Sequence, residues 1–376
     1  MTQGNKVTGR SDLGIDLVAG ARPNFMKLAP VHRAIVEAGN LEPRIIHTGQ
    51  HYDSAMSRVF FEELGIPEPD KDLEVGSGRH GQQTARILER YEQHLLSERP
   101  VATVVFGDVN STVACALAAV KEGVPIVHVE AGLRSFDRTM PEEINRLLTD
   151  SISDLLFVTE SSGVDNLKHE GIDQGKVELV GNVMIDSLFR MLEAAKDRET
   201  TSRLGLDQGQ YGLVTLHRPS NVDDPRILGP LIELLHELSD SLPLVFPVHP
   251  RTAAAAERAG LADKLKGGES RLLCLAPQPY LDHLSLMSTA AVVLTDSGGM
   301  QEETSVLGIP CLTMRDNTER PITLELGTSR LVGNDSNVIR DAFAEAISGD
   351  WPEGKKIPLW DGRAGARIAE SLGRRL

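Results

Sequence analysis

The chain has 376 residues, of which 40% are hydrophobic and 25% charged; this composition is typical of globular proteins, and the length favours two domains. Its formal net charge of −15 argues against binding to nucleic acid or to an anionic membrane, because both require clustered lysine and arginine. No apolar run approaches the ~18 residues of a membrane span, and the polar N-terminal segment does not resemble a signal peptide, so we expect a cytoplasmic protein.

Short apolar runs with helical segments between them occupy the first half of the chain. They are IDLVAG (15–20), PRIIHTG (43–49), VATVVFGD (101–108), PIVHVEAG (125–132), DLLFVTE (154–160) and VELVGN (177–182). The runs are apolar throughout instead of alternating, as expected of parallel strands that helices cover on both faces. We therefore predict a doubly wound sheet, in which ligands bind beyond the carboxyl ends of the strands.

Charged side chains lie at the expected ends of these strands. Arg22 and Lys27 follow the first strand, where they suit either a diphosphate or a solvated helix start. Asp108 and Glu130 follow the third and fourth strands. Carboxylates that converge on one site suit proton transfer, because burial and mutual repulsion separate their pKa values.

The segment MPEEINR predicts a helix that begins at Pro141, with Glu142 and Glu143 in its first turn. These glutamates suit helix capping, and a Glu142–Arg146 pair would add ~0.3–0.5 kcal/mol. Adjacent helix positions point in different directions, so we expect one of the two glutamates to face the ligand.

Two sequence patterns that suggest other chemistry are set aside. GSGRHG (76–81) matches a dinucleotide-binding pattern, but no buried strand precedes it, so we interpret it as a loop before a helix and expect no nicotinamide cofactor. Cys115, Cys274 and Cys311 lie far apart in apolar segments and are interpreted as reduced core thiols. No spacing typical of zinc ligands occurs, so no metal site is predicted.

The apolar pattern restarts in the second half, with runs at 211–218, 242–249, 271–277, 291–297, 310–315 and 330–335. The two series predict an α/β fold of two Rossmann-like domains, residues 1–184 and 185–360, with an active-site cleft between them. The closing segment 361–376 has helical periodicity, and the sequence leaves open whether it packs back on the first domain.

Strand ends in the second half carry His217, His249 and the segment DSGGMQEE (296–303). Lone histidines at such positions are more often structural, although each is followed by an arginine or by Pro-Arg. Gly298 and Gly299 open a helix whose N-terminus suits a phosphate, with Glu302 and Glu303 one turn further in, where they could accept hydrogen bonds from a ribose. A plain strand-to-helix turn capped by Ser297 explains the same residues.

In this order along the chain, GARPNFMKLAP, TGQHYD, FGDVNST, HVEAGLRSFDRTMPEEINR, VGNVMID, TLHRPSN, DSGGMQEE and MRDNTERP resemble the non-hydrolysing UDP-N-acetylglucosamine 2-epimerases. The resemblance runs from Gly20 to about Gly333. It implies a two-domain fold like that of the GT-B glycosyltransferases, a cytoplasmic homodimer and no cofactor. It also implies conversion of UDP-GlcNAc to UDP-ManNAc for surface polysaccharide precursors, by elimination of UDP to 2-acetamidoglucal and re-addition.

The resemblance also implies roles for single residues. Those that match the family's catalytic residues are Asp108, Glu130, Glu142 and His217. Those that match substrate contacts are Arg22, Lys27, Ser297, Gly298 and Gly299 at the diphosphate, Glu303 at the ribose, Arg320 near the sugar and phosphates, and His249. Gln50, His51 and Arg218 match a second, activating UDP-GlcNAc site of many bacterial members, but the sequence departs from their pattern there, with HRPSN for HRREN and Tyr52-Asp53 after TGQH.

Other functions fit parts of the pattern. SFDRTMPEEINR also resembles epimerases of modified UDP-sugars such as diacetamido-uronic acids, a different substrate for the same chemistry. A GT-B glycosyltransferase would share the fold but needs an acceptor site and fewer carboxylates. A hydrolysing epimerase would release UDP and free ManNAc, and an inactive nucleotide-sugar sensor would have no need of Asp108, Glu130, Glu142 and His217.

Overall fold

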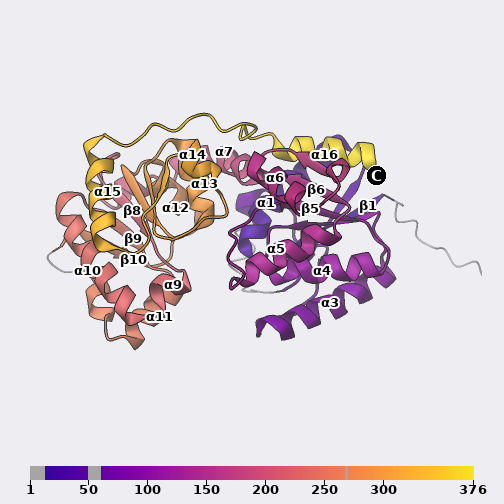
Figure 1. The fold of residues 1–376 in the computed structure, drawn as a ribbon, viewed down its shortest axis with the longest axis horizontal. Helices are drawn as coiled ribbons and strands as arrows, with labels where there is room; N and C mark the ends of the chain where they lie inside the picture. The colour runs from indigo at the N-terminus through magenta and orange to yellow at the C-terminus, as the bar shows by residue number, and fades with distance from the viewer. Residues whose placement is uncertain (1–12, 50–60, 267–269) are drawn as a thin grey trace, which may run out of the picture. The chain divides into compact units, whose positions relative to one another are not determined.

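The computed structural model describes residues 13–49, 61–266 and 270–376 and divides the chain into two compact units. The first unit comprises Met1–Ser187 and Asp361–Leu376, and the second comprises Leu188–Trp360. Figure 1 shows each as a sheet with helices around it. The α/β class and the two Rossmann-like sheets predicted from the apolar runs are confirmed. Among the described residues, no helix combines the length and hydropathy that a membrane span requires.

The first unit is built on a seven-stranded parallel sheet. Its strands are β1 (Gly14–Ala19), β2 (Glu42–His47), β3 (Lys71–Asp72), β4 (Ala102–Phe106), β5 (Ile126–Ala131), β6 (Leu155–Val158) and β7 (Val177–Leu179), in the spatial order β3-β2-β1-β4-β5-β6-β7. The helices are α1 (Arg22–Ala38), α3 (His80–Ser97), α4 (Asn110–Lys121), α5 (Pro141–Ile152), α6 (Ser161–His169), the start of α7 (Val183–Lys196) and α16 (Ala364–Arg375), with a 3-10 turn η1 (Gln174–Lys176). The order reverses between β1 and β4, which is where open sheets bind ligands.

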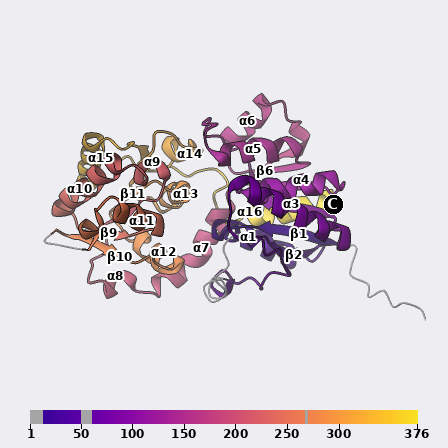
Figure 2. The same cartoon turned by 90° about the horizontal axis from the view of Figure 1, so that it is seen from below.

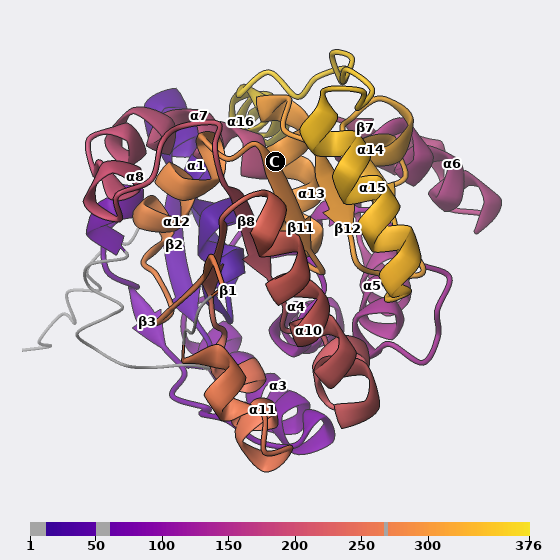
Figure 3. The same ribbon diagram turned by 90° about the vertical axis from the view of Figure 1, so that its left-hand side faces the viewer.

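The second unit repeats this plan. Its strands are β8 (Gly212–Thr215), β9 (Leu244–Pro247), β10 (Leu272–Leu275), β11 (Val292–Thr295), β12 (Cys311–Thr313) and β13 (Ser329–Leu331), in the order β10-β9-β8-β11-β12-β13. Its helices are α8 (Thr200–Arg203), α9 (Pro219–Val222), α10 (Pro225–Ser241), α11 (Pro250–Arg258), α12 (Tyr280–Ser288), α13 (Gly298–Leu307), α14 (Ile322–Glu325) and α15 (Ser336–Ser348), with η2 (Ala262–Leu265). Figure 3 shows α10 and α15 side by side, and both helices contribute to the hydrophobic core of the second unit.

The segment GSGRHG leads into α3, as the sequence predicted. It follows β3, a two-residue strand at the edge of the sheet whose residues are partly exposed, and not a buried central strand. The dinucleotide pattern therefore lacks the strand-turn-helix setting that pyrophosphate binding requires.

The helix α16 packs on α1 in the first unit, as Figure 2 shows. Its first amides, those of Ala364 and Gly365, donate to the carboxylate of Asp186 at 3.1 and 2.8 Å. A side chain at Gly365 would place its Cβ 2.7 Å from the carbonyl oxygen of Pro30, so the close approach of the two helices requires glycine there.

Pro30 lies inside α1, where it has no N–H for the carbonyl oxygen of Met26. The hydroxyl of Ser187 donates to that oxygen instead, at 2.6 Å, and Ser187 and Met26 are both buried. The last residue of the first unit before the chain enters the second is thus bonded to the first turns of α1.

Candidate active site

Glu130 sits at a β-bulge near the end of β5. Its φ is +74°, and the pairing of β5 with β6 shifts register between Val129 and Ala131. A left-handed backbone is unfavourable for glutamate, and bulges re-aim side chains at functional edges of sheets. Here the carboxylate is buried and accepts a hydrogen bond from the ammonium of Lys27, a residue of α1.

Gly107 makes room for this ion pair. It joins β4 to Asp108 with φ +64°, and an added Cβ would lie 2.9 Å from Lys27 Nζ and 3.1 Å from Glu130 Oε2. The structure therefore brings Lys27 and Glu130 against the residue that precedes Asp108. These three predicted site residues lie together because β1, β4 and β5 are neighbours in the sheet.

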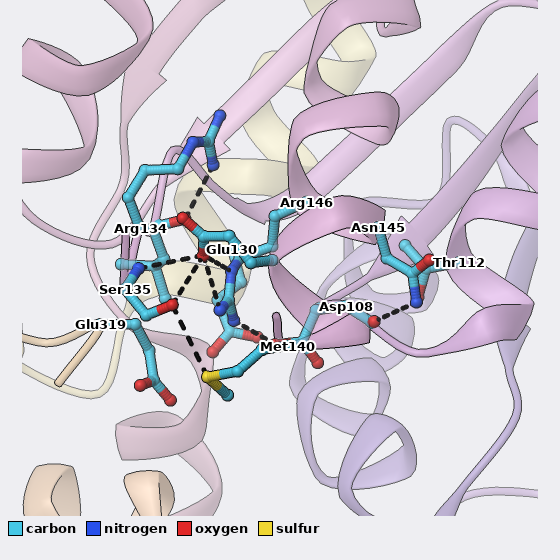
Figure 4. Close-up of polar contacts among 12 residues, drawn as sticks. Asp108, Thr112, Glu130, Arg134, Ser135, Met140, Asn145, Arg146 and Glu319 are labelled. Carbon is cyan, nitrogen blue, oxygen red and sulfur yellow. Dashed lines mark hydrogen bonds and ion pairs between the residues drawn. The ribbon is translucent and has the colours of Figure 1, made fainter. Parts of the chain in front are cut away.

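Asp108 is held from α5 by two consecutive residues. Asn145 Nδ2 donates to its backbone carbonyl at 2.8 Å, and Arg146 Nη1 donates to Oδ2 at 2.5 Å; Figure 4 shows both contacts at the start of α5. Arg146 also donates to Glu143 through Nε and Nη2, at 3.1 and 2.9 Å. Arg146 thus bonds to Glu143 and Asp108, whereas the helix spacing had suggested Glu142 as its partner.

The two glutamates in the first turn of α5, Glu142 and Glu143, differ in burial. Glu143 is buried and accepts hydrogen bonds from the backbone N–H groups of Ser135 and Phe136 and from the Ser135 hydroxyl, at 3.0, 2.9 and 3.1 Å. Burial raises the pKa of Glu143, but these donors and Arg146 outweigh it and hold the pKa below its ordinary value. Glu142 is only half-buried. Glu143 thus uses both carboxylate oxygens in hydrogen bonds within the protein, and Glu142 is the more exposed of the two glutamates.

A buried histidine and aspartate support the same strand ends. His128 Nδ1 lies 2.6 Å from Asp150 Oδ1, and its Nε2 lies 2.8 Å from the carbonyl oxygen of Gly107. Asp150 Oδ2 accepts from the amide of Gly132 at 3.1 Å and pairs with Arg134. Burial raises the pKa of Asp150, but the opposing effect of His128 and Arg134 is larger, so the pKa lies below its ordinary value. The ionised carboxylate of Asp150 therefore anchors the ends of β4 and β5.

In the second unit, Asp296 organises the turn between β11 and α13. It is buried, and its carboxylate accepts from the amides of His217 and Arg218 and from Asn221 Nδ2, at 2.8–3.2 Å. His217 Nδ1 lies 3.0 Å from Oδ1. Burial raises the pKa of Asp296, but its bonds to His217 and to the amides lower it below the ordinary value.

Ser297 occupies the N-cap position of α13, but its side chain makes no capping hydrogen bond. The start of this helix therefore differs from the capped turn that was the alternative interpretation. Gly298 adjoins Arg320, since an added Cβ would lie 2.6 Å from Nη1, whereas Gly299 faces open space. The same Cβ would lie 2.9 Å from Glu319 Oε1, so the start of the helix adjoins both a guanidinium and a carboxylate.

Arg320 belongs to a charged cluster, defined as Arg218, Glu302, Arg315, Glu319 and Arg320. Arg320 donates to Glu302 at 2.6 Å and to Glu319 at 2.5 Å, and Arg315 donates to Glu319 at 2.8 Å. Arg218 Nη2 lies 3.8 Å from Glu319. The cluster fixes the guanidinium of Arg320 beside the glycines of α13.

Glu303, one turn into α13, is buried and accepts a hydrogen bond from the hydroxyl of Tyr280 at 2.7 Å. Burial raises the pKa of Glu303 to about 7; the Tyr280 hydroxyl opposes part of this shift, and Glu302 adds to it. Burial therefore moves the pKa of this predicted ribose contact toward neutrality.

The imidazole rings of His217 and His249 lie side by side, with their centroids 5.2 Å apart. His249 is the N-cap of α11, and its Nδ1 accepts from the amide of Arg251 at 3.1 Å. Burial and the neighbouring His217 lower the pKa of His249, which favours a neutral ring at physiological pH.

Some predicted residues are not placed by the structure. Gln50 and His51 lie outside the described residues, and so does the side chain of Arg22, whose backbone begins α1. Sequence reasoning in turn missed His128, Arg146, Asp150 and Tyr280. A histidine in the middle of the buried run PIVHVEAG was a detectable signal, because an apolar strand interior rarely holds one without a partner.

Sequence comparisons match one enzyme family over most of the chain. A family model described as UDP-N-acetylglucosamine 2-epimerase matches residues 33–373. The UDP-N-acetylglucosamine 2-epimerase of Methanocaldococcus jannaschii is 41% identical over 366 residues, which cover 95% of this chain and 98% of the relative. The UDP-2,3-diacetamido-2,3-dideoxy-D-glucuronate 2-epimerase of Pseudomonas aeruginosa is 43% identical over 359 residues, which cover 94% and 98%.

A solved structure gives the same result in three dimensions. The crystal structure of the M. jannaschii UDP-GlcNAc 2-epimerase in complex with UDP-GlcNAc and UDP superposes with a TM-score of 0.89 at 41% identity, covering 96% of this chain and 99% of that one.

Proposed function

The chain belongs to the UDP-N-acetylglucosamine 2-epimerase family, and from this membership we propose that it interconverts UDP-GlcNAc and UDP-ManNAc. The observation that carries the proposal is the bulge at Glu130, which holds an otherwise unfavourable backbone so that a carboxylate meets Lys27 beside Asp108. Backbone strain of this kind persists where the position of a side chain serves function.

The reaction proceeds by elimination and re-addition. Loss of the C2 proton and cleavage of the bond between C1 and the diphosphate oxygen give 2-acetamidoglucal and UDP. UDP then adds back at C1 while C2 takes a proton on the opposite face. UDP must stay bound between these steps, so the reaction needs nucleotide contacts as well as carboxylates.

We assign the acid and base steps to Asp108, Glu130 and Glu142. Asp108 lies just beyond β4 and Glu130 near the end of the adjacent β5, and they pair with Arg146 and Lys27 respectively. Glu142 is favoured over Glu143, because Glu143 already accepts a full set of hydrogen bonds.

The proposed diphosphate and nucleotide contacts follow the family resemblance. His217 lies near the departing diphosphate, and the remaining substrate contacts are Arg22, Lys27, His249, Ser297, Gly298, Gly299, Glu303 and Arg320. Support comes from the uncapped start of α13 and the guanidinium of Arg320 beside Gly298. The epimerisation changes no oxidation state overall, so it requires no redox cofactor.

Proton NMR of the purified protein with UDP-GlcNAc in heavy water tests the proposal. Formation of UDP-ManNAc with deuterium at C2 of both sugars supports it. Release of UDP and free ManNAc would indicate the hydrolysing reaction instead, and transfer of the sugar to an added acceptor would indicate a glycosyltransferase.

A second substrate is favoured by one observation, the 43% identity to the P. aeruginosa UDP-diacetamido-glucuronate 2-epimerase. The same experiment with that diacetamido-uronic sugar nucleotide decides between the two, because the preferred substrate has the higher kcat/KM.

We also propose that the enzyme acts in the cytoplasm as a homodimer. Light scattering of the purified protein tests the oligomeric state.

A further inference from the structure

Two buried charged residues of α5 connect Asp108 to a loop that follows β5. Arg146, which is 2% exposed, uses Nη1 for Asp108 and both Nε and Nη2 for Glu143. Glu143, which is 1% exposed, uses its two oxygens for the amides of Ser135 and Phe136. An unbroken series of hydrogen bonds therefore runs from the loop to the carboxylate at the end of β4 (Figure 4).

The loop end of this series has an unusual conformation. Phe136 has φ +59°, which is rare for a bulky side chain, and the residue is 77% exposed. A buried carboxylate that binds two consecutive amides holds the turn in this conformation. The turn follows the same strand as Glu130 and so belongs to the edge of the sheet where ligands bind.

We infer that Glu143 and Arg146 are positioning residues, which hold Asp108 and the Ser135–Phe136 turn in one fixed arrangement for the epimerisation. The inference rests on the proposed function, because it assigns Asp108 to the reaction. The guanidinium is essential to this role, since its fixed fork spans two carboxylates, whereas the single nitrogen of a lysine cannot.

A kinetic double-mutant cycle tests the link to Asp108. Arg146→Met is expected to lower kcat by about 10²-fold, because a displaced carboxylate is no longer aligned with C2, while KM stays within a few-fold. In the Asp108→Asn background the same change is expected to cost little. The inference would be overturned if the losses in kcat from the two substitutions multiplied in the double variant, as independent effects do. It would also be overturned if Arg146→Met changed KM alone. Arg146→Lys should recover only part of the loss.

Amide hydrogen exchange tests the link to the loop without any substrate. In Glu143→Gln and Arg146→Met, residues 133–140 are expected to exchange roughly 10-fold faster than in the wild type, whereas β4 stays protected. Glu143→Gln is nearly isosteric and keeps the test available if Arg146→Met does not fold.

Unchanged exchange of residues 133–140 in both variants would overturn the inference whatever the activity. If the wild type does not epimerise UDP-GlcNAc but exchange responds as expected, the physical link stands and only the proposed substrate and reaction fail. The two experiments therefore separate the inference from the function on which it rests.

Discussion

The hydroxyl of Tyr280 donates a 2.7 Å hydrogen bond to the buried carboxylate of Glu303, which stands one turn into the helix that follows β11. The pair links α12 to α13 and fixes one oxygen of Glu303. It therefore also restricts the position of the other oxygen, which we propose accepts a hydrogen bond from a ribose hydroxyl.

Glu303→Gln is expected to stabilise the protein at pH 8 and to weaken UDP binding about 10-fold. Burial raises the pKa of Glu303 to about 7, so its contribution to stability is complete below the unfolded pKa and is lost as pH rises through 7. Glutamine does not ionise and so avoids this loss of folding stability. The loss amounts to about 3 kcal/mol at pH 8 and disappears below about pH 4.5. Denaturant unfolding at pH 4.5 and pH 8, with calorimetric titration of UDP, measures both effects; equal destabilisation at the two pH values would contradict the prediction.

Glu130→Gln is expected to lower turnover by at least about 10³-fold while UDP affinity stays within a few-fold. The amide keeps the shape of the side chain but cannot exchange a proton or pair with Lys27 as an anion. Initial rates by NMR and calorimetry with UDP check the prediction. A variant with near-normal turnover would remove Glu130 from the acid–base group.

Gly107→Ala is expected to reduce turnover by about 10²-fold or more, because the new methyl group displaces the Lys27–Glu130 pair. Gly39→Ala is a matched control: Gly39 also has positive φ, at +69°, but no atom lies within 4 Å of its Cβ position. Both variants should lose about 1–2 kcal/mol of stability from backbone strain. Similar turnover in the two variants would show that the space beside Gly107 is not required.

Ser187→Ala is expected to destabilise the first unit by about 1–3 kcal/mol, because the carbonyl of Met26 loses its donor inside the protein. In a Pro30→Ala background the helix supplies its own N–H to that carbonyl, so the same change should cost much less. Denaturant titration of the four proteins of this cycle measures the difference. An equal cost in both backgrounds would show that the hydroxyl does not compensate for the proline.

The sheets and the strand-end residues were predictable from sequence for a simple physical reason. Parallel strands covered on both faces are apolar throughout, so Asp108 and Glu130 stand out where each run ends. The carboxyl ends of parallel strands share one edge, so residues far apart in the chain were expected near each other.

The partners of these residues were not predictable in the same way. Helix spacing allows Arg146 to pair with either Glu142 or Glu143, and only the packing of α5 against α4 and β5 selects Glu143 and Asp108. The bulge at Glu130 leaves no mark in an apolar run, because it concerns the register between two strands. Tyr280 reaches Glu303 across two helices, and no local pattern joins them.

The return of α16 to the first unit affects the order in which the protein can be completed during synthesis. Residues 188–360 form one uninterrupted unit, whereas α16 leaves the ribosome only after that entire unit and then covers α1. The whole of the second unit is therefore synthesised while the first still lacks a helix. The sheet that carries Asp108 and Glu130 is begun early and closed late, and during that interval the surface of α1 that later contacts α16 is available to chaperones.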